Sequence, residues 1–414
     1  MTPIAYVILD GAPEGVVEEG TPMARANLIG WDGPIFGGLT DVIGNDWVPE
    51  SHSGVLNLLG NRLLPAEVPR GPVEAIGVGL EVQPGDLTFR CNFGVMDPIT
   101  MRVIERRVCR EIDTATSDAL SRLIVEHQRE DMPFSIDMAA SRDYRCVARL
   151  RSKDGTPLSS AVSNTDPAYP VEGHEVFSDT GYDRIESIPL DESNAAFTTA
   201  AYVNQFVEHC ERVLSLDDSK SVQVGQHMFA STVLTRGPGT AIPELPRLSD
   251  TLLSDVVMIA ESHIERGIAR MLGCGLTMVK EVDEGEFYQE ALSLALAAVD
   301  RGQSVVIHLK GPDEFGHDGD LDGKTAVLER IGRHFLDPLV AQAVESHLVV
   351  VTSDHCTPCR AKRHTADPVP FVLCGQSVNF GNVRQLSERA CSEGIRLNSG
   401  VDLFRIIQMT ASYA

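Results

Sequence analysis

The chain is short of positive charge. Its 414 residues carry 35 lysines and arginines against 59 aspartates and glutamates, which gives a formal net charge of -24. Nucleic acids and anionic membrane surfaces select for basic proteins, so neither is expected as a partner. A small anionic ligand remains compatible with this composition, provided that metal ions or clustered arginines supply positive charge locally.

Long apolar runs and a disulfide framework are also missing. No run approaches the roughly 20 apolar residues that cross a bilayer. The nine cysteines show no regular spacing, and no signal peptide is recognisable, which together favour a reducing cytoplasm. Cys356-Thr-Pro-Cys359 looks like a zinc or redox pair, but it has no second pair at zinc-finger spacing, so we interpret it as incidental.

Aspartates and histidines, by contrast, gather near the C-terminus at Asp313, His317, Asp354, His355 and His364. Two apolar runs that read as buried strands, 304–309 and 347–352, end just before them, and the run 4–9 ends at Asp10. The carboxyl ends of parallel strands meet at one edge of a sheet, so these side chains are expected to lie together there.

These residue types predict a metal centre with a nucleophile beside it. Carboxylate oxygens and neutral imidazoles suit Zn²⁺ or Mn²⁺, and five such ligands exceed what one catalytic metal usually takes. Two adjacent metals are therefore the natural interpretation. Ser51 and Ser53 precede an apolar run, and a serine beside metals can act as a nucleophile. The alternative role for either serine is a helix N-cap.

The remaining pattern predicts an α/β protein with a doubly wound, mostly parallel sheet and an inserted α+β domain. Residues 1–68 and 232–414 would form the metal-binding core, and residues 69–231 an inserted substrate-binding lid. Glycine- and proline-rich segments mark the two points at which the chain would pass between the core and the inserted domain. Helices are expected at 113–130, 252–272, 287–300 and 324–344, and a strand at 143–150.

Several stretches carry a family resemblance: Leu9–Gly11, Arg70–Gly77, Pro84–Phe93, Glu105–Arg110, Ser163–Pro167, Lys310–Gly319, Thr352–His355 and His364–Pro370. With them, nearly the whole chain resembles the archaeal-type cofactor-independent phosphoglycerate mutases of the alkaline phosphatase superfamily. The resemblance implies an alkaline-phosphatase-like fold. It also implies an isomerase that moves a phosphoryl group within one phosphoglycerate through a phosphoserine.

The resemblance also sorts the ligands into two divalent metal sites. One site is expected to use Asp313, His317 and His364. The other is expected to use Asp10, Ser51, Asp354 and His355, with Ser51 rather than Ser53 as the nucleophile. The metals would be Mn²⁺ or Zn²⁺, with Mg²⁺ and Co²⁺ as alternatives. Arg266 stands where the family has a lysine near the phosphoryl group, and it is expected to contribute to catalysis.

Substrate contacts are expected from the arginines and from one polar element of the insertion: Arg90, Arg106, Arg107, Arg110, Asn164, Asp166 and Arg266. On a helix, Arg106 and Arg110 would share a face, where like charges repel unless an anion lies between them. A solvated basic stripe is the alternative. The expected ligand is a small phosphorylated or phosphonylated acid.

One departure from the family leaves the substrate open. The family usually has Ser-Asp-Thr-Ala-His from the nucleophile onward, whereas this chain has Ser51-His-Ser-Gly-Val55. Loss of the imidazole predicts a poor phosphoglycerate mutase, slower by roughly 10- to 100-fold or more, unless His52 replaces the lost group. One alternative is a mutase or hydrolase of a phosphonate analogue in a specialised biosynthetic pathway. Another is a non-catalytic metal-binding homologue.

Overall fold

The computed structural model divides into two compact units. One comprises Met1–Pro65, Glu244–Glu261 and Ile268–Ala414, and the other Ala66–Pro243 and Ser262–Gly267. The structure describes residues 2–18, 20–29, 33–44, 46–171, 176, 178, 181–222, 229–240, 242–279, 284–376, 378, 381 and 383–412.

The first unit is built on an eight-stranded sheet with the order β10-β9-β11-β1-β12-β13-β2-β14 in the described residues. The five strands from β10 to β12 run parallel, and β13 is antiparallel to both of its neighbours. The predicted mostly parallel α/β sheet is thereby confirmed. Its strands are β1 (Ile4–Leu9), β2 (Ile35–Thr40), β9 (Val256–Ala260), β10 (Gly275–Met278), β11 (Ser304–Leu309), β12 (Leu348–Ser353), β13 (Val369–Cys374) and β14 (Ile395–Leu397).

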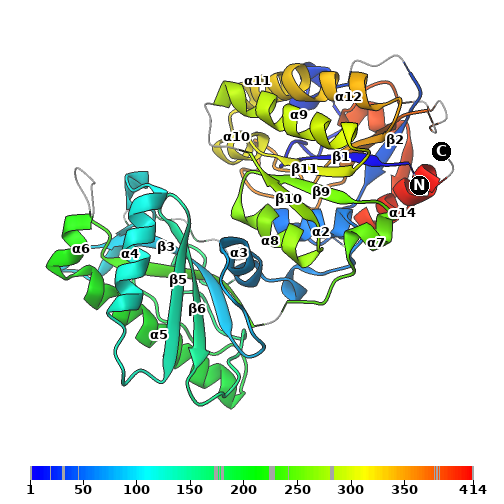
Figure 1. Cartoon of the computed structure of the whole chain (residues 1–414). Coiled ribbons are helices and arrows are strands. Elements are labelled where there is room, and N and C mark those ends of the chain that lie inside the picture. The colour runs from blue at the N-terminus through cyan, green and yellow to red at the C-terminus, as the bar shows by residue number, and fades with distance from the viewer. Residues whose placement is uncertain are drawn as a thin grey trace. The chain divides into compact units, whose positions relative to one another are not determined.

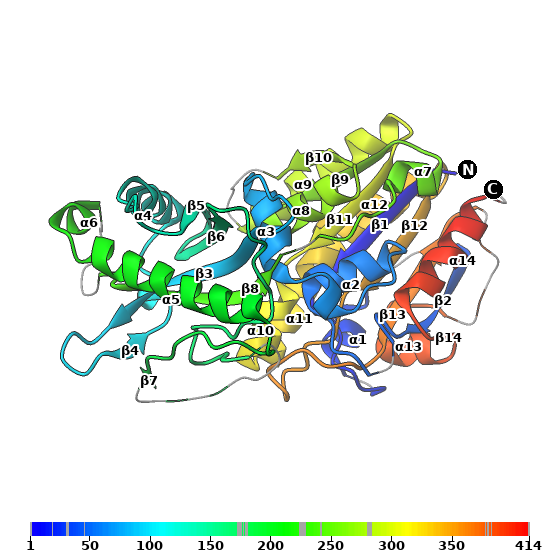
Figure 2. The ribbon, with the colours of Figure 1, turned by 90° about the horizontal axis from the view of Figure 1, so that it is seen from below.

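Helices cover both faces of this sheet (Figures 1 and 2). On one face lie α9 (Glu284–Asp300), α11 (Leu321–Ile331) and α12 (Asp337–Ala343), and on the other α2 (Ser51–Leu58) and α14 (Gly400–Ser412). No helix in the described part of the chain is both long and apolar enough to cross a membrane. The shorter helices of this unit are α1 (Pro22–Ala26), α7 (Leu248–Leu252), α10 (Pro312–Asp318) and α13 (Glu388–Ser392).

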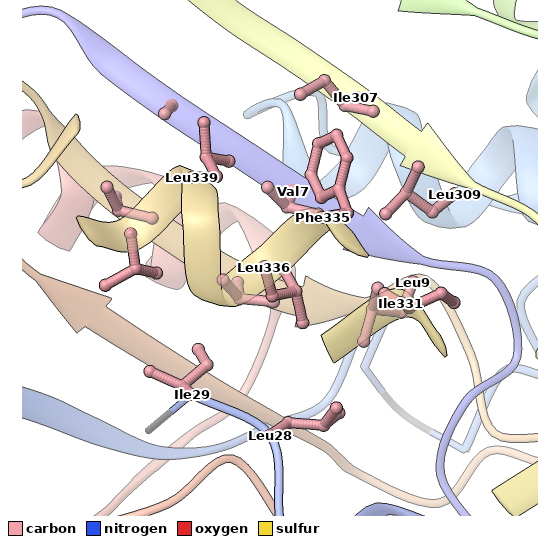
Figure 3. Close-up of a cluster of buried hydrophobic side chains, with 14 of the residues drawn as sticks. Val7, Leu9, Leu28, Ile29, Ile307, Leu309, Ile331, Phe335, Leu336 and Leu339 are labelled. Carbon is pink, nitrogen blue, oxygen red and sulfur yellow. The ribbon is translucent and has the colours of Figure 1, made fainter. Parts of the chain in front are cut away.

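The alternation of side chains along the central strands decides where polar groups can go. Val7 of β1 and Ile307 of β11 belong to the core under α11 and α12, where Phe335 and Leu339 pack against them (Figure 3). Successive side chains in a strand point to opposite faces. The even-numbered positions of β1, β11 and β12 therefore face the side of the sheet that α2 covers.

The second unit contains an antiparallel sheet with the order β5-β6-β3-β4-β7, and β8 also pairs with β3. Helices α4 (Thr114–Glu126) and α5 (Asn194–Leu214) pack on one face of this sheet (Figure 1), and α3 (Arg70–Val78) contacts the other. The strands are β3 (Leu87–Met96), β4 (Arg102–Glu105), β5 (Phe134–Arg142), β6 (Arg145–Ser152), β7 (Tyr182–Asp183) and β8 (Thr232–Gly239). The second unit also contains α6 (Asp217–Val222) and the first part of α8 (His263–Met271). The rest of α8 belongs to the first unit.

Most expected elements are present, but the helix expected at 252–272 is wrong. That segment contains the end of α7, the strand β9 and then α8. All five residues of β9 are buried, and an uninterrupted apolar run of this length suits a strand covered on both faces. The expected domain boundary before residue 232 also differs from the contact units, because β8 pairs with β3 and lies in the second unit.

Candidate active site

All seven residues expected to bind metal lie in the first unit, around the carboxyl ends of β1 and β12. Asp10 follows β1, and Asp354 and His355 follow β12, as the sequence predicts for a parallel sheet. Among the described residues, two groups of potential metal-binding side chains have ligand atoms that all lie within 4.8 Å of one another. They are Asp313 with His355 and His364, and Asp10 with His308 and Asp354.

The first group centres on Asp313, in the first turn of α10. Nε2 of His364 lies 3.5 Å from Oδ1 of Asp313, and Nε2 of His317 lies 3.5 Å from its Oδ2. The rings of His355 and His364 stack with their centroids 3.7 Å apart. The three expected ligands Asp313, His317 and His364 therefore lie together, and His355 is beside them.

The second group surrounds Asp10. Oγ of Ser51 lies 3.5 Å from Oδ1 of Asp10 and 3.4 Å from Nε2 of His355. That Nε2 lies 3.3 Å from the same Asp10 oxygen and 3.4 Å from Oδ2 of Asp354. Both aspartates and His355 are at most 5% exposed, so water screens their charges little.

Hydrogen bonds fix the tautomers of the three predicted histidine ligands. Nδ1 of His317 lies 3.0 Å from the carbonyl oxygen of Lys362, and Nδ1 of His364 lies 3.0 Å from that of Pro49. A carbonyl oxygen only accepts, so both Nδ1 atoms donate a proton. Each Nε2 atom then faces Asp313, as metal coordination through Nε2 requires.

A hydrogen bond with Thr357 fixes the orientation of the His355 ring. The Thr357 hydroxyl lies 2.6 Å from Oδ1 of Asp313 and 3.0 Å from Nδ1 of His355. An ionised carboxylate only accepts, so the single hydroxyl proton goes to Asp313, and the hydroxyl oxygen accepts from the Nδ1–H of His355. Nε2 of His355 thereby faces Asp10 and Ser51.

The donors fit divalent cations. Asp354 is completely buried, and its Oδ2 receives no hydrogen bond from any described residue. A buried charged oxygen without a donor is costly, and a cation removes that cost. Carboxylates and correctly oriented imidazoles are also the donor types that borderline divalent metals prefer. The donor set of this site therefore supports the expected metal dependence.

Charges around the site keep its carboxyl groups ionised. Burial opposes ionisation of Asp10, but Lys310 Nζ at 2.9 Å from its Oδ2, together with His355, holds its pKa well below the usual range. Burial and the charge of Asp10 likewise oppose ionisation of Asp313, but His364 and His355 together outweigh them, so the pKa of Asp313 is lowered. The contact with Asp313 raises the pKa of His364 to about 9, although burial alone would lower it.

Ser51 and Ser53 differ in what their hydroxyls do. Ser51 is the first residue of α2, where the helix dipole favours negative charge. Ser53 forms a capping box, in which its Oγ accepts from the backbone N–H of Glu50 at 3.1 Å while the Glu50 side chain accepts from the Ser53 backbone. The hydroxyl that faces Asp10 and His355 is therefore that of Ser51.

Sequence reasoning missed three residues of this site: His308, Lys310 and Thr357. His308 lies inside a strand that was correctly predicted. The signal available in the sequence was a histidine within an apolar run, and its register with Ile8 of β1 is known only from the structure. Lys310 follows the same strand. Thr357 lies between Cys356 and Cys359, which are free thiols.

The second unit holds the residues expected to bind substrate, and several are engaged with one another. Arg106 makes a bidentate pair with Asp166, at 2.7 and 2.6 Å, and Asp166 is fully buried. Asn164 donates to the carbonyl oxygen of Tyr169 at 2.8 Å and accepts from the backbone of Gly237 at 3.2 Å. These bonds order the loop that contains Asn164 and Asp166.

The shared helical face considered for Arg106 and Arg110 is not present. β4 ends at Glu105, and Val108, Cys109 and Arg110 all have positive φ, at 47°, 51° and 58°. A right-handed helix cannot include such residues. Arg110 is exposed, and Arg107 is partly buried.

Arg90 lies in a different arginine cluster, on the face of the sheet that α3 contacts. It pairs across strands with Arg236, and Arg145 pairs with Asn92, two residues further along β3. Arg90 is 8% exposed, and its Nε finds no hydrogen-bond partner in the described part of the chain. Burial, followed by the charges of Arg70 and Arg145, lowers the pKa of Arg90 well below its usual value.

Glu74 of α3 is the carboxylate of this cluster. It accepts from Arg70 Nε at 2.5 Å, and although it is buried, Arg70 and Arg90 lower its pKa. Arg266 lies in the same unit, with its Nη1 3.3 Å from Nδ1 of His263. Burial, followed by the charge of Arg266, lowers the pKa of His263. The cluster therefore holds more guanidinium groups than carboxylates.

Comparison with known proteins gives a consistent result. Residues 36–218 match the family model described as 2,3-bisphosphoglycerate-independent phosphoglycerate mutase. The mutase of that name from Aeropyrum pernix is 33% identical, with 99% of each chain covered. One from Archaeoglobus fulgidus is 29% identical over 98% of this chain and 97% of its own.

Solved structures share the fold. A Pyrococcus horikoshii protein has a TM-score of 0.72 at 20% identity, covering 100% of this chain and 98% of its own. The cofactor-independent phosphoglycerate mutase from Thermoplasma acidophilum has a TM-score of 0.61 at 22% identity, covering 99% of this chain and 100% of its own. The names of these relatives give no support to a phosphonate pathway. By its identity to the Aeropyrum enzyme over almost the entire length of both chains, the protein belongs to the 2,3-bisphosphoglycerate-independent phosphoglycerate mutase family.

Proposed function

We propose that this protein is a metal-dependent isomerase that moves the phosphoryl group between two hydroxyls of phosphoglycerate, with Ser51 as the covalent carrier. The observation that carries the proposal is the position of Ser51. Its Oγ lies within 3.5 Å of Asp10 and His355 at the first residue of a helix. Family membership supports the substrate, and the complete donor set argues against a non-catalytic homologue.

Two divalent metals, Mn²⁺ or Zn²⁺, belong to this proposal. Asp313, His317 and His364 would hold one, and Asp10, Ser51, Asp354 and His355 the other. The metals would lower the cost of the serine alkoxide and of charge on the phosphoryl oxygens. Because His355 lies beside both groups, a displacement of this residue would disturb both sites.

Ser51 would act in two transfers. In the first, the Ser51 hydroxyl loses its proton and its Oγ forms a bond to phosphorus while the bond from phosphorus to the substrate oxygen breaks, and that oxygen takes up a proton in exchange. In the second, the other hydroxyl of the bound glycerate attacks the phosphoserine and loses its proton, which regenerates Ser51. Water must be kept out between these steps, since attack by water would give a phosphatase instead.

We infer that the substrate's charged groups are recognised in the second unit by Arg90 with Arg70, Arg145 and Arg236. A buried arginine cluster with one carboxylate is offset by an anion, and guanidinium groups bind carboxylate or phosphate oxygens in a bidentate manner. Arg106, Asn164 and Asp166 would instead order the neighbouring loop. Arg107, Arg110 and Arg266 would supply further positive charge to the substrate, and Arg266 would act on the phosphoryl group.

Substitution of Arg90 separates this role from metal binding. Arg90→Met should raise KM for phosphoglycerate by about 10-fold or more, because a charge-assisted hydrogen bond contributes roughly 1.5–3 kcal/mol. Metal content should stay unchanged. Arg122→Met is a matched control, since Arg122 is an exposed arginine of α4 in the same unit. An unchanged KM in Arg90→Met would remove Arg90 from the proposal.

The overall proposal is tested by phosphorus NMR with 3-phosphoglycerate and the Mn²⁺-loaded protein. The resonance of 2-phosphoglycerate should appear, and the Ser51→Ala variant should not produce it. Inorganic phosphate alone would identify a phosphatase, and no conversion by the loaded wild-type protein would defeat the proposal. A reducing cytoplasm is the setting that we infer, because all nine cysteines are free thiols.

A further inference from the structure

We propose that His308 is a metal ligand, adding a second imidazole to the site formed by Asp10, Ser51, Asp354 and His355. The inference rests on the proposed metal dependence and deepens it, because it predicts which class of cation that site selects. No role for His308 was expected from the sequence.

The strand register places His308 on the correct side of the sheet. It pairs with Ile8 of β1 and is therefore one step of two residues before Asp10 on the same face. Its neighbours Ile307 and Leu309 point the other way, into the core under α11 and α12 (Figure 3). The ring of His308 thus lies on the face that carries Asp10 and Asp354, and it is only 2% exposed.

The contacts of its Nε2 converge on the same point as those of the expected ligands. Nε2 of His308 lies 3.1 Å from Oδ2 of Asp354 and 3.8 Å from Oδ1 of Asp10. Nε2 of His355 lies 3.4 and 3.3 Å from these two oxygens. Two carboxylate oxygens and two imidazole nitrogens therefore surround one position.

The state of Asp354 argues that a cation belongs there. Its Oδ2 is close to two imidazole nitrogens, yet it receives no aligned hydrogen bond from any described residue. A neutral imidazole that donated to it would satisfy this oxygen and lower the cost of burying it. The geometry is instead that of donors sharing a metal ion. His308 keeps this role whichever site takes His355.

The resulting donor set has a chemical consequence. Asp10, Asp354 and Ser51 would supply three oxygens, and His308 and His355 two nitrogens. Mg²⁺ prefers octahedral oxygen ligands and retains its waters, whereas imidazoles suit Zn²⁺, Co²⁺ and Mn²⁺. The second site should therefore reject Mg²⁺ more strongly than a site with one imidazole would.

Metal titration of the His308→Gln variant tests the role of the residue. The chelator-treated full-length protein would be reloaded with Zn²⁺ or Co²⁺ and followed by calorimetry and elemental analysis. The affinity for one of the two bound metal ions should fall. Because loss of an outer-shell partner already lowers metal affinity by roughly 10- to 100-fold, loss of a direct ligand should lower it by at least as much. The Co²⁺ visible spectrum should change as well, and the preference for Zn²⁺ over Mg²⁺ should shrink.

His347→Gln provides the matched control. His347 is a buried histidine of the same unit, 3% exposed, and its ring nitrogens contact Gln303 and Ser346 rather than the metal site. This variant should bind both equivalents as the wild type does. Unchanged binding and an unchanged Co²⁺ spectrum in His308→Gln would overturn the inference.

A measurement on the wild-type protein keeps the inference testable if His308→Gln fails to fold. In protein labelled with ¹⁵N-histidine and loaded with ¹¹³Cd²⁺, couplings between metal and nitrogen count the bound imidazoles. Four coupled imidazoles are expected: His308, His317, His355 and His364. Three would exclude His308. Because the count needs no turnover, it can succeed even where the proposed mutase activity fails, and the two failures are distinguishable.

Discussion

At the scale of single residues, Ser51 is the proposed nucleophile, whereas Ser53 caps the start of α2. Ser51→Ala should abolish turnover and leave most metal bound, because Asp10, Asp354 and His355 still supply ligands. Ser53→Ala should lower stability by about 1 kcal/mol through loss of the cap and leave measurable activity. Assays of turnover, metal content and thermal unfolding would check both variants. Phosphopeptide mapping that placed the trapped phosphate on Ser53 would contradict the assignment.

Thr357 offers a second prediction at this scale, because its hydroxyl joins Asp313 to His355. Thr357→Val keeps the shape but releases the Nδ1 proton of His355, so the ring can rotate or change tautomer. Metal affinity should fall by about 10- to 100-fold. Thr357→Ser keeps the hydroxyl and should bind metal almost normally. Equal affinities for the valine and serine variants, measured by calorimetry, would show that the hydroxyl is unimportant.

Site residues that directly follow a predicted strand could be found from the sequence, whereas those placed by strand register or by packing were missed. Asp10 and Asp354 directly follow apolar strands, so their placement could be predicted from the strands alone. His308 lies within such a strand, and only the register with β1 shows which neighbours it meets. Arg70, Arg145 and Arg236 come from separate segments, and strand pairing or packing of α3 brings them to Arg90.

At the scale of elements, the packing of α2 on the end of β12 positions Ser51, the proposed nucleophile. A Cβ built on Gly54 would lie 2.5 Å from the backbone oxygen of Asp354, so the helix approaches this ligand directly. Gly54→Ala should push α2 and Asp354 apart, at a cost of about 1–3 kcal/mol in stability, and should weaken metal binding. Thermal unfolding and metal titration would check this.

Gly332→Ala is the control for Gly54→Ala. Gly332 has helical backbone angles, φ -54° and ψ -59°, and a Cβ there meets only the end of the Leu28 side chain, at 3.1 Å. It should leave metal binding unchanged. If Gly54→Ala behaved like this control, the close approach of α2 would not be needed for the site.

Helices and strands with a clear apolar pattern could be predicted from the sequence. Which elements pack or pair with each other could be predicted less well. β1, β11 and α9 follow directly from their runs of apolar residues. β9 was taken for helix because an apolar run of five residues fits either structure, and only pairing with β10 and β11 makes it a strand. β8 joins the second unit for a similar reason, since its partner β3 is more than a hundred residues earlier.

At the scale of the whole molecule, charges of opposite sign gather in two different places. The first unit brings carboxylates together around sites that fit divalent cations. The second brings guanidinium groups together on one face of its sheet. A net charge of -24 thus disfavours polyanions in general, and the arginine cluster is where we propose that a small anion binds. How these charges are distributed depends on the fold and could not be obtained from composition.

Metal binding should couple to pH through His364, whose pKa is raised to about 9 by Asp313. Below that pH the His364 ring of the metal-free protein carries a second proton, on Nε2. Coordination of a metal through Nε2 requires the loss of this proton. Apparent metal affinity should therefore rise from pH 6 to 9, by up to about tenfold per unit for each proton released. Calorimetry in buffers of different ionisation enthalpy would measure that release, which should be close to one proton from this ring at pH 7.

The same shift predicts opposite pH trends for metal-free and metal-loaded protein. A histidine whose pKa is raised in the folded state stabilises it fully below the unfolded value of about 6.5, and this stabilisation is lost as the pH rises through about 9. The metal-free protein should therefore lose thermal stability between pH 6.5 and 9, while added metal should stabilise it increasingly over the same range. His364→Gln should remove both trends. A metal-free wild type whose unfolding temperature stayed constant across this range would show that the contact between Asp313 and His364 does not hold the proton.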